Sequence, residues 1–173
     1  PMLDVVTMVY AGLVNKNIVA GLQAKNCNSV GFTGADMDLI RAFKRPVKEI
    51  DYGFVGDVAE VNTRELSYLL SQNIAPVIAP LTHDGNGTLL NTNADTIASE
   101  LAISLCSDYN VTLVYCFEKD GVLSNPDDEK SVIRELDRES YRAYLADGTI
   151  AAGMIPKLET AFRALNSGVN MVL

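Results

Sequence analysis

The sequence predicts an α/β fold, a three-layer α/β/α sandwich in which helices cover both faces of a mainly parallel sheet. Short apolar segments typical of strands alternate along the 173 residues with longer segments of helical period. A single polar turn, HDGNG, predicts one antiparallel hairpin within this pattern. No repeat, low-complexity tract or linker divides the chain, so we expect residues 1–173 to form one domain.

The first predicted element is a broad apolar helix. Residues 2–24 place Val5, Val9, Leu13 and Ile18 near one helical face. A core helix and a helix at a subunit interface give the same pattern. We therefore expect one of these two roles rather than a cofactor site.

Three strands and a helix are predicted next. Residues 29–32 (SVGF) form a short apolar segment before the turn TGADMD, and residues 39–44 and 56–61 also have strand character. Asn62 and Glu65 have the spacing of a capping box, which predicts that TRELSYLLSQ is a helix.

The second half alternates in the same way. APVIAP and TLLNT flank the predicted hairpin turn, and ADTIASELAISLC has helical period. VTLVYCF is a continuous apolar run, typical of a strand covered on both faces. A helix ending at Gly148 follows, and then a helix with Pro156 at its first position and Gly168 at its C-terminal cap. NMVL is expected to begin another strand.

Composition excludes several classes of function. The net charge of −8 disfavours nucleic acid as a partner, and any anion site must be built locally from lysines and helix N-termini. No uninterrupted apolar run approaches the roughly 20 residues of a membrane span, so no membrane partner is expected. The three cysteines lack metal-ligand spacing and suggest reduced thiols in the cytoplasm, and His83 is interpreted as a solvated loop residue.

Two segments at strand-to-helix connections could carry chemistry. NTNAD holds Asn91, Asn93 and Asp95, although Asn93 or Asp95 could simply cap the helix that follows. GMIPK places Lys157 in the first turn of a helix, where the helix dipole disfavours a cation unless an anion such as phosphate lies nearby. A solvated surface lysine is the alternative interpretation.

Taken together and in order, these segments resemble the acetylglutamate kinases of the amino acid kinase fold. The likeness covers essentially the whole chain and includes AGLVNKNIV, GFTGADMDLI, GFVGDV, PVIAP, NTNADTIA and DGTIAAGMIPK. It implies an ATP-dependent transfer of phosphate to the side-chain carboxylate of N-acetyl-L-glutamate, or of a close analogue such as N-succinylglutamate, in arginine biosynthesis. It also implies Mg²⁺, a homodimer, and a fold that is incomplete at both ends of this chain.

The resemblance also implies roles for individual residues. Lys157 would stabilise the transferring phosphoryl group, Asp95 would orient lysines, and Asn91 and Asn93 would bind the glutamate derivative. The nucleotide site would lie along residues 117–123 and 150–157. Its expected binding residues are Glu118, Asp120, Gly121, Val122, Leu123, Ile150, Gly153 and Met154.

Two alternatives stay open. Another amino acid kinase, acting on carbamate, aspartate or glutamate, would share the fold, but the NTNAD segment with its hairpin disfavours it. A regulatory or ligand-binding relative would keep the fold and lack the chemistry, which the presence of both Asp95 and Lys157 disfavours.

Overall fold

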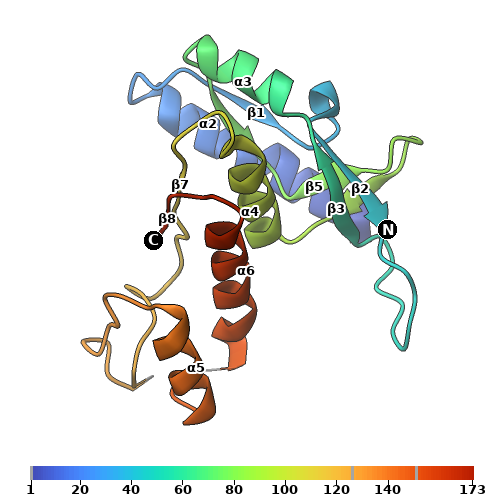
Figure 1. Cartoon of the computed structure of the whole chain (residues 1–173). Coiled ribbons are helices and arrows are strands. Elements are labelled where there is room, and N and C mark those ends of the chain that lie inside the picture. The colour runs from blue at the N-terminus through green and yellow to red at the C-terminus, as the bar shows by residue number, and fades with distance from the viewer. Residues whose placement is uncertain (1, 126, 151) are drawn as a thin grey trace. The chain divides into compact units, whose positions relative to one another are not determined.

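The computed structural model describes residues 2–125, 127–150 and 152–173 (Figure 1). The chain divides into two compact units, Pro1–Ser104 and Leu105–Leu173, and each is described by itself. The expectation of a single domain over residues 1–173 stays a prediction.

The first unit opens with a continuous helix of three parts. These are α1 (Met2–Val6), a π-helical part η1 (Thr7–Val14) and α2 (Asn15–Gln23). Asn15 is buried, and its side-chain Nδ2 donates to the carbonyl oxygen of Val77 at 2.8 Å. Lys16 Nζ donates to the carbonyl oxygen of Gly31 at 3.2 Å. Both bonds attach the helix to strands of the first unit.

The apolar face of this helix is exposed within its unit. Val5, Val9, Leu13 and Ile18 are 49%, 39%, 63% and 47% exposed, so the core-helix interpretation is wrong for this unit. By length and composition, the 22-residue helix Met2–Gln23 is also apolar enough to cross a membrane, and an 18-residue stretch of it has a mean hydropathy of 1.4. The sequence-based test for a membrane span considered only uninterrupted apolar runs and therefore did not detect this helix. Core helices and signal sequences share these properties, so length and composition alone carry no further conclusion.

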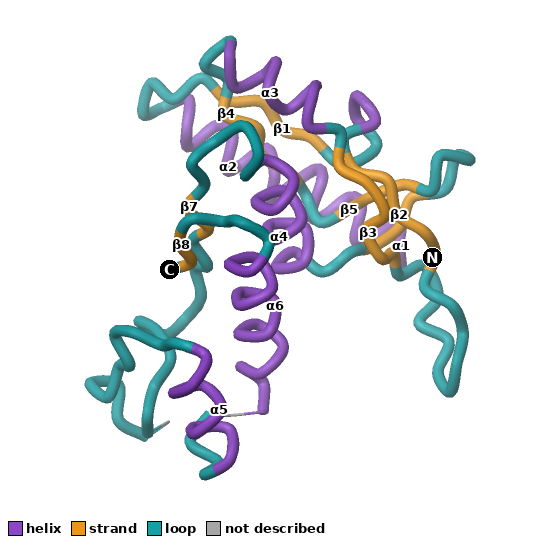
Figure 2. The backbone as a smooth tube through the Cα atoms, in the orientation of Figure 1, coloured by secondary structure: helices purple, strands orange, loops and turns teal. Residues whose placement is uncertain are grey.

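A parallel pair of strands lies beside this helix. Strand β1 (Ser29–Phe32) pairs with β4 (Ala75–Ile78), with Ser29 opposite Ala75. Helices α2 and α3 (Thr63–Ser71) both lie against this pair (Figure 2). The predicted cap of α3 is present, because Asn62 Oδ1 accepts a hydrogen bond from the Glu65 backbone N–H at 3.4 Å.

A four-stranded sheet completes the first unit, in the order β3-β2-β5-β6. Its strands are β2 (Ile40–Lys44), β3 (Gly56–Val61), β5 (Leu81–His83) and β6 (Leu89–Asn91), and the short helix η2 (Asp36–Asp38) precedes β2. The predicted hairpin is β5 with β6. Ile40, Leu81 and Leu90 are at most 1% exposed and centre the core on this sheet. Helix α4 (Ala94–Leu105) follows β6.

The second unit contains the remaining elements. Strands β7 (Thr112–Leu113) and β8 (Met171–Val172) pair in parallel. Helices α5 (Arg138–Ala146), η3 (Ala152–Met154) and α6 (Ile155–Asn166) lie between them in the chain. Tyr141, Ile150 and Phe162 form a core cluster of this unit, and the Tyr141 and Phe162 rings lie 5.1 Å apart between centroids.

The observed pairing confirms the α/β class with mainly parallel strands. In the described residues, three of the five strand pairs are parallel, and the two antiparallel pairs are β2–β3 and β5–β6. The prediction for VTLVYCF was wrong in length, because only Thr112 and Leu113 form strand β7 and Val114 is 55% exposed. Strand β8 pairs with it through Val172, and the Tyr115 backbone N–H donates to the carbonyl oxygen of Leu173 at 2.9 Å.

Candidate functional site

The NTNAD segment joins strand β6 to helix α4. Asn91 is the last residue of β6 and is half-buried, and Asp95 lies in the first turn of α4, where the helix dipole favours a carboxylate. Asn93 caps the helix, because its Oδ1 accepts from the Thr96 backbone N–H at 3.0 Å. The capping role that sequence left open between Asn93 and Asp95 therefore belongs to Asn93.

Thr92 has a structural role in the same segment. Its side chain is 3% exposed, and its Oγ1 lies 2.8 Å from Thr82 Oγ1 and donates to the carbonyl oxygen of Gly56 at 3.2 Å. Packing is close here, since a Cβ on Gly56 would lie 2.9 Å from Thr92 Oγ1. This network holds the end of β6 against β3 and β5. Asn91 and Asp95 are the other polar residues of the segment.

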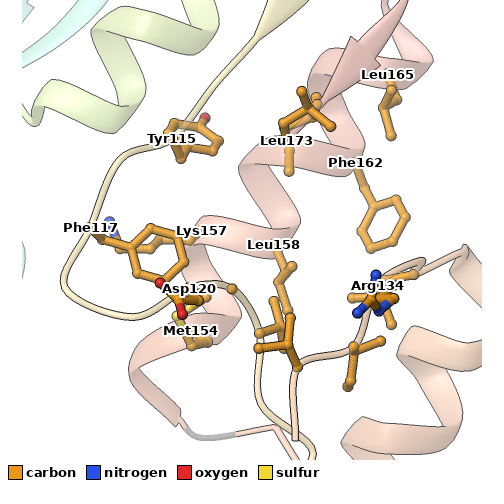
Figure 3. Close-up of a pocket in the computed structure, with 17 residues that line it drawn as sticks. Tyr115, Phe117, Asp120, Arg134, Met154, Lys157, Leu158, Phe162, Leu165 and Leu173 are labelled. Atoms are coloured by element: carbon orange, nitrogen blue, oxygen red, sulfur yellow. The ribbon is translucent and has the colours of Figure 1, made fainter. Parts of the chain in front are cut away.

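The second unit contains a cavity of about 350 Å³ beside helix α6 (Figure 3). Its wall is mainly apolar and carries three charged side chains, those of Asp120, Arg134 and Lys157. The lining residues come from the segment after β7, from the loop of residues 132–136, from α6 and from β8. They are Tyr115, Phe117, Asp120, Gly121, Val122, Val132, Ile133, Arg134, Leu136, Met154, Lys157, Leu158, Ala161, Phe162, Leu165, Val172 and Leu173.

A hairpin-like loop builds one wall of this cavity. The Ile133 backbone N–H donates to the carbonyl oxygen of Val122 at 2.8 Å, and Leu123 bridges Val132. Gly121 permits the close approach of the two arms, because a Cβ there would lie 3.0 Å from Val132 Cγ1. The loop thus carries residues about ten positions apart to the same wall.

Lys157 extends from the first turn of α6 toward the segment after β7. Its Nζ lies over the Phe117 ring, 6.0 Å from the ring centroid (Figure 3). Lys157 is half-buried and lines the cavity, so the interpretation as a solvated surface lysine is wrong. A cation at a helix N-terminus on a cavity wall is suited to bind an anion.

The predicted nucleotide residues fall into three groups. Asp120, Gly121, Val122 and Met154 line the cavity with Lys157. Glu118 and Leu123 line a separate small hollow with Asp120, where Lys119 and Glu129 form an ion pair at 2.8 Å.

Neither of the other two residues lines the cavity. Ile150 is 5% exposed in the core of the unit, and Gly153 is exposed with open space around its Cα. Ala151, within the predicted stretch 150–157, lies outside the described residues.

Several cavity residues escaped the motif-based prediction. Tyr115, Arg134 and Phe162 line the cavity but belong to no recognisable nucleotide motif. The segment after β7, the loop of residues 132–136 and helix α6 bring them there. Only the helical spacing of Leu158, Phe162 and Leu165 could have pointed to an apolar face on α6.

His83 differs from the sequence-based interpretation. It ends strand β5, its side chain is only 15% exposed, and its Nε2 lies 2.8 Å from Asp38 Oδ1. Its Nδ1 accepts from the Gly85 backbone N–H at 3.2 Å, so in the neutral ring Nε2 carries the proton and faces the Asp38 carboxylate. Hydrogen bonds from Arg41 hold the pKa of the Asp38 carboxyl below its ordinary value. This histidine is a paired structural residue.

The part of the chain that the structure describes contains no preformed cluster of side chains for the expected Mg²⁺. No three His, Cys, Asp or Glu side chains gather there in a way that could hold an ion. Mg²⁺ commonly keeps several waters and binds through substrate phosphates with one or two carboxylates, so such a cluster is not a requirement for it.

Comparisons with known proteins point to one family. A model of the amino acid kinase family matches residues 1–173. The chain is 61% identical over 171 residues to an acetylglutamate kinase of Bacteroides thetaiotaomicron, covering 99% of this chain and 66% of the relative. It is 57% identical over 172 residues to one of Cytophaga hutchinsonii, covering 99% and 65%. The chain thus spans about two thirds of the length of these curated relatives.

A solved structure has a similar fold. The protein smu.665 of Streptococcus mutans UA159 superposes with a TM-score of 0.81 at 28% sequence identity. The match covers 96% of this chain and 64% of that protein.

Proposed function

Because the chain belongs to the amino acid kinase family, we propose that it transfers the γ-phosphate of ATP to the side-chain carboxylate of N-acetyl-L-glutamate. The observation that carries the proposal is the identity of 61% to an acetylglutamate kinase over 99% of the chain. The reaction would serve arginine biosynthesis. N-succinylglutamate is the second candidate substrate, because it presents the same side-chain carboxylate.

The proposed chemistry needs no covalent intermediate on the protein. An oxygen of the substrate carboxylate attacks the γ-phosphorus, the bond to the β–γ bridging oxygen breaks, and ADP leaves with the electron pair. The attacking carboxylate is already ionised at neutral pH, so no general base is required. Positioning and neutralisation of charge on the phosphoryl oxygens are what the protein has to supply.

The cavity of the second unit is our proposed nucleotide site. Its apolar wall suits an aromatic base, and Lys157 at the start of α6 suits the phosphates. Asp120, Gly121, Val122 and Met154 would contact the nucleotide. ATP is the proposed co-substrate, and Mg²⁺ would enter with it and supply charge neutralisation between the phosphates.

In the first unit, Asn91 and Asp95 are the proposed substrate-side residues. Asn91 would hold the glutamate derivative, with the Nδ2 of the capping residue Asn93 as a second donor. Asp95 acts as an organiser of lysine ammonium groups rather than as a base, because a carboxylate near phosphates is repulsive unless it holds a cation.

We propose that the exposed apolar helix Met2–Gln23 forms a homodimer interface in a cytoplasmic enzyme. Leu13 is 63% exposed in the middle of the helix, where a second copy would cover it. Leu13→Glu is then expected to convert dimer to monomer in sedimentation or light scattering. Lys25→Gln, just beyond the helix, changes the net charge by the same amount and is the matched control. Unchanged mass for Leu13→Glu would refute this interface.

The decisive assay measures ADP release by the protein with MgATP and, separately, N-acetyl-L-glutamate, N-succinyl-L-glutamate and free L-glutamate. Turnover with one acylated substrate identifies the acyl group. Lys157→Met and Asp95→Asn are expected to lower kcat at least about 100-fold, the scale of losing one transition-state donor. A folded protein that turns over none of the three substrates would favour the ligand-binding alternative.

A further inference from the structure

The structure holds an aromatic contact to the proposed catalytic lysine. Phe117 and Lys157 both line the cavity of the second unit, and Lys157 Nζ lies 6.0 Å from the Phe117 ring centroid (Figure 3). That separation is at the outer limit of a cation–π interaction. We propose that Phe117 is a positioning residue for Lys157, whose ammonium group the ring holds toward the cavity before the nucleotide binds.

A ring is well suited to this task. Lys157 lies in the first turn of α6, where the helix dipole disfavours a cation, and the negative face of an aromatic ring partly offsets this. A carboxylate in place of the ring would form an ion pair that competes with phosphate for the ammonium. The ring offers no hydrogen-bond acceptor, so this contact itself occupies none of the N–H donors of Lys157.

Phe117 is also one of the exposed large apolar residues of its unit. It follows β7 in the chain, is 38% exposed, and is absent from the core cluster of Tyr141, Ile150 and Phe162 and from the residues packed on it. A substitution of Phe117 is therefore expected to leave the fold intact. This makes the contact testable without loss of the structure.

The first test is spectroscopic and needs no catalysis. In protein with isotope-labelled lysine, the Lys157 ε-methylene resonance is identified by its loss in Lys157→Met. The ring current of Phe117 is expected to displace this resonance in the wild type and in Phe117→Tyr, which keeps the ring. In Phe117→Leu the displacement is expected to disappear. Tyr109→Leu removes a ring of the same exposure, 39%, outside the cavity and is expected to change nothing.

The second test separates positioning from wall packing, and it rests on the proposed function. Phe117→Leu is expected to lower kcat by about two- to fivefold with an unchanged KM for ATP, the loss expected for an exposed cation–π contact. Phe117→Tyr is expected to restore kcat. An unchanged kcat with a raised KM would mean that the ring only contacts the nucleotide, and would overturn the inference.

The two tests also separate the inference from the proposed function. A Lys157 resonance that is identical in the wild type and in Phe117→Leu would show that the contact is absent in solution, and would overturn the inference alone. Absence of turnover in the folded wild type would overturn the proposed reaction and any role of Phe117 in it, even if the resonance is displaced.

Discussion

The Tyr141 hydroxyl is a buried polar group whose removal is expected to stabilise the protein. Tyr141 belongs to α5, its ring lies against Phe162 of α6, and it is 8% exposed. Its hydroxyl has no hydrogen-bond partner among the described residues. A buried donor without a partner costs about 1–3 kcal/mol. The void left by one oxygen atom costs a few tenths of a kcal/mol, at about 24 cal/mol per Å³. Tyr141→Phe keeps the ring contact with Phe162.

The net expectation is a gain of about 1–2 kcal/mol in the free energy of unfolding for Tyr141→Phe. In a chain of this size that corresponds to a rise in Tm of roughly 2–8 °C. Thermal unfolding followed by circular dichroism, with urea unfolding as a second measurement, would detect it. Tyr68→Phe is the matched control, because Tyr68 is 59% exposed and its hydroxyl is accessible to water.

The pH dependence gives an independent check on the same residue. Burial, with a smaller contribution from the negative charge of Glu159, raises the pKa of Tyr141 above its ordinary value. The folded state therefore holds this proton more tightly than the unfolded state. Its contribution to stability is complete below about pH 10 and is lost as the pH rises through the folded-state pKa. The variant lacks this loss, so its advantage is expected to widen above pH 10.

A lower Tm for Tyr141→Phe would refute this reasoning, because it would mean that the hydroxyl has a favourable partner such as a buried water. A gain of the same size in Tyr68→Phe would refute it differently, since burial would then not be the cause.

Two further predictions concern helix ends. Asn93→Ala is expected to lower the free energy of unfolding by about 1 kcal/mol, because it removes the acceptor for the Thr96 N–H, whereas Asn93→Asp keeps that acceptor. Urea unfolding distinguishes the two, and equal losses would contradict the capping role. Gly168→Ala is expected to cost about 1–2 kcal/mol, because Gly168 has φ 105° beyond the end of α6. A Cβ there would also lie 3.2 Å from Cys106 Sγ, and an unchanged Tm would contradict the prediction.

Local sequence predicted the helices well, because their signals act within a few residues. Asn62, Asn93 and Gly168 perform the capping roles that their positions suggested. Strand length was predicted poorly for VTLVYCF, because residue hydrophobicity indicates burial and does not indicate which neighbour a strand pairs with. Exposure of the first helix was also beyond local prediction, since an apolar face does not reveal what covers it.

The candidate functional site shows the same division between features set by local sequence and features set by long-range contacts. The sequence by itself determined the family, the two segments NTNAD and GMIPK, and the placement of Lys157 in the first turn of a helix, because each depends on residue type and spacing along the chain. Only the tertiary structure decided that Thr92 belongs to a buried hydroxyl network and that Ile150 is a core residue. It also brought Phe117 and Arg134 to the wall beside Lys157. These outcomes depend on contacts between segments that are distant in the sequence, and patterns of neighbouring residues do not predict such contacts.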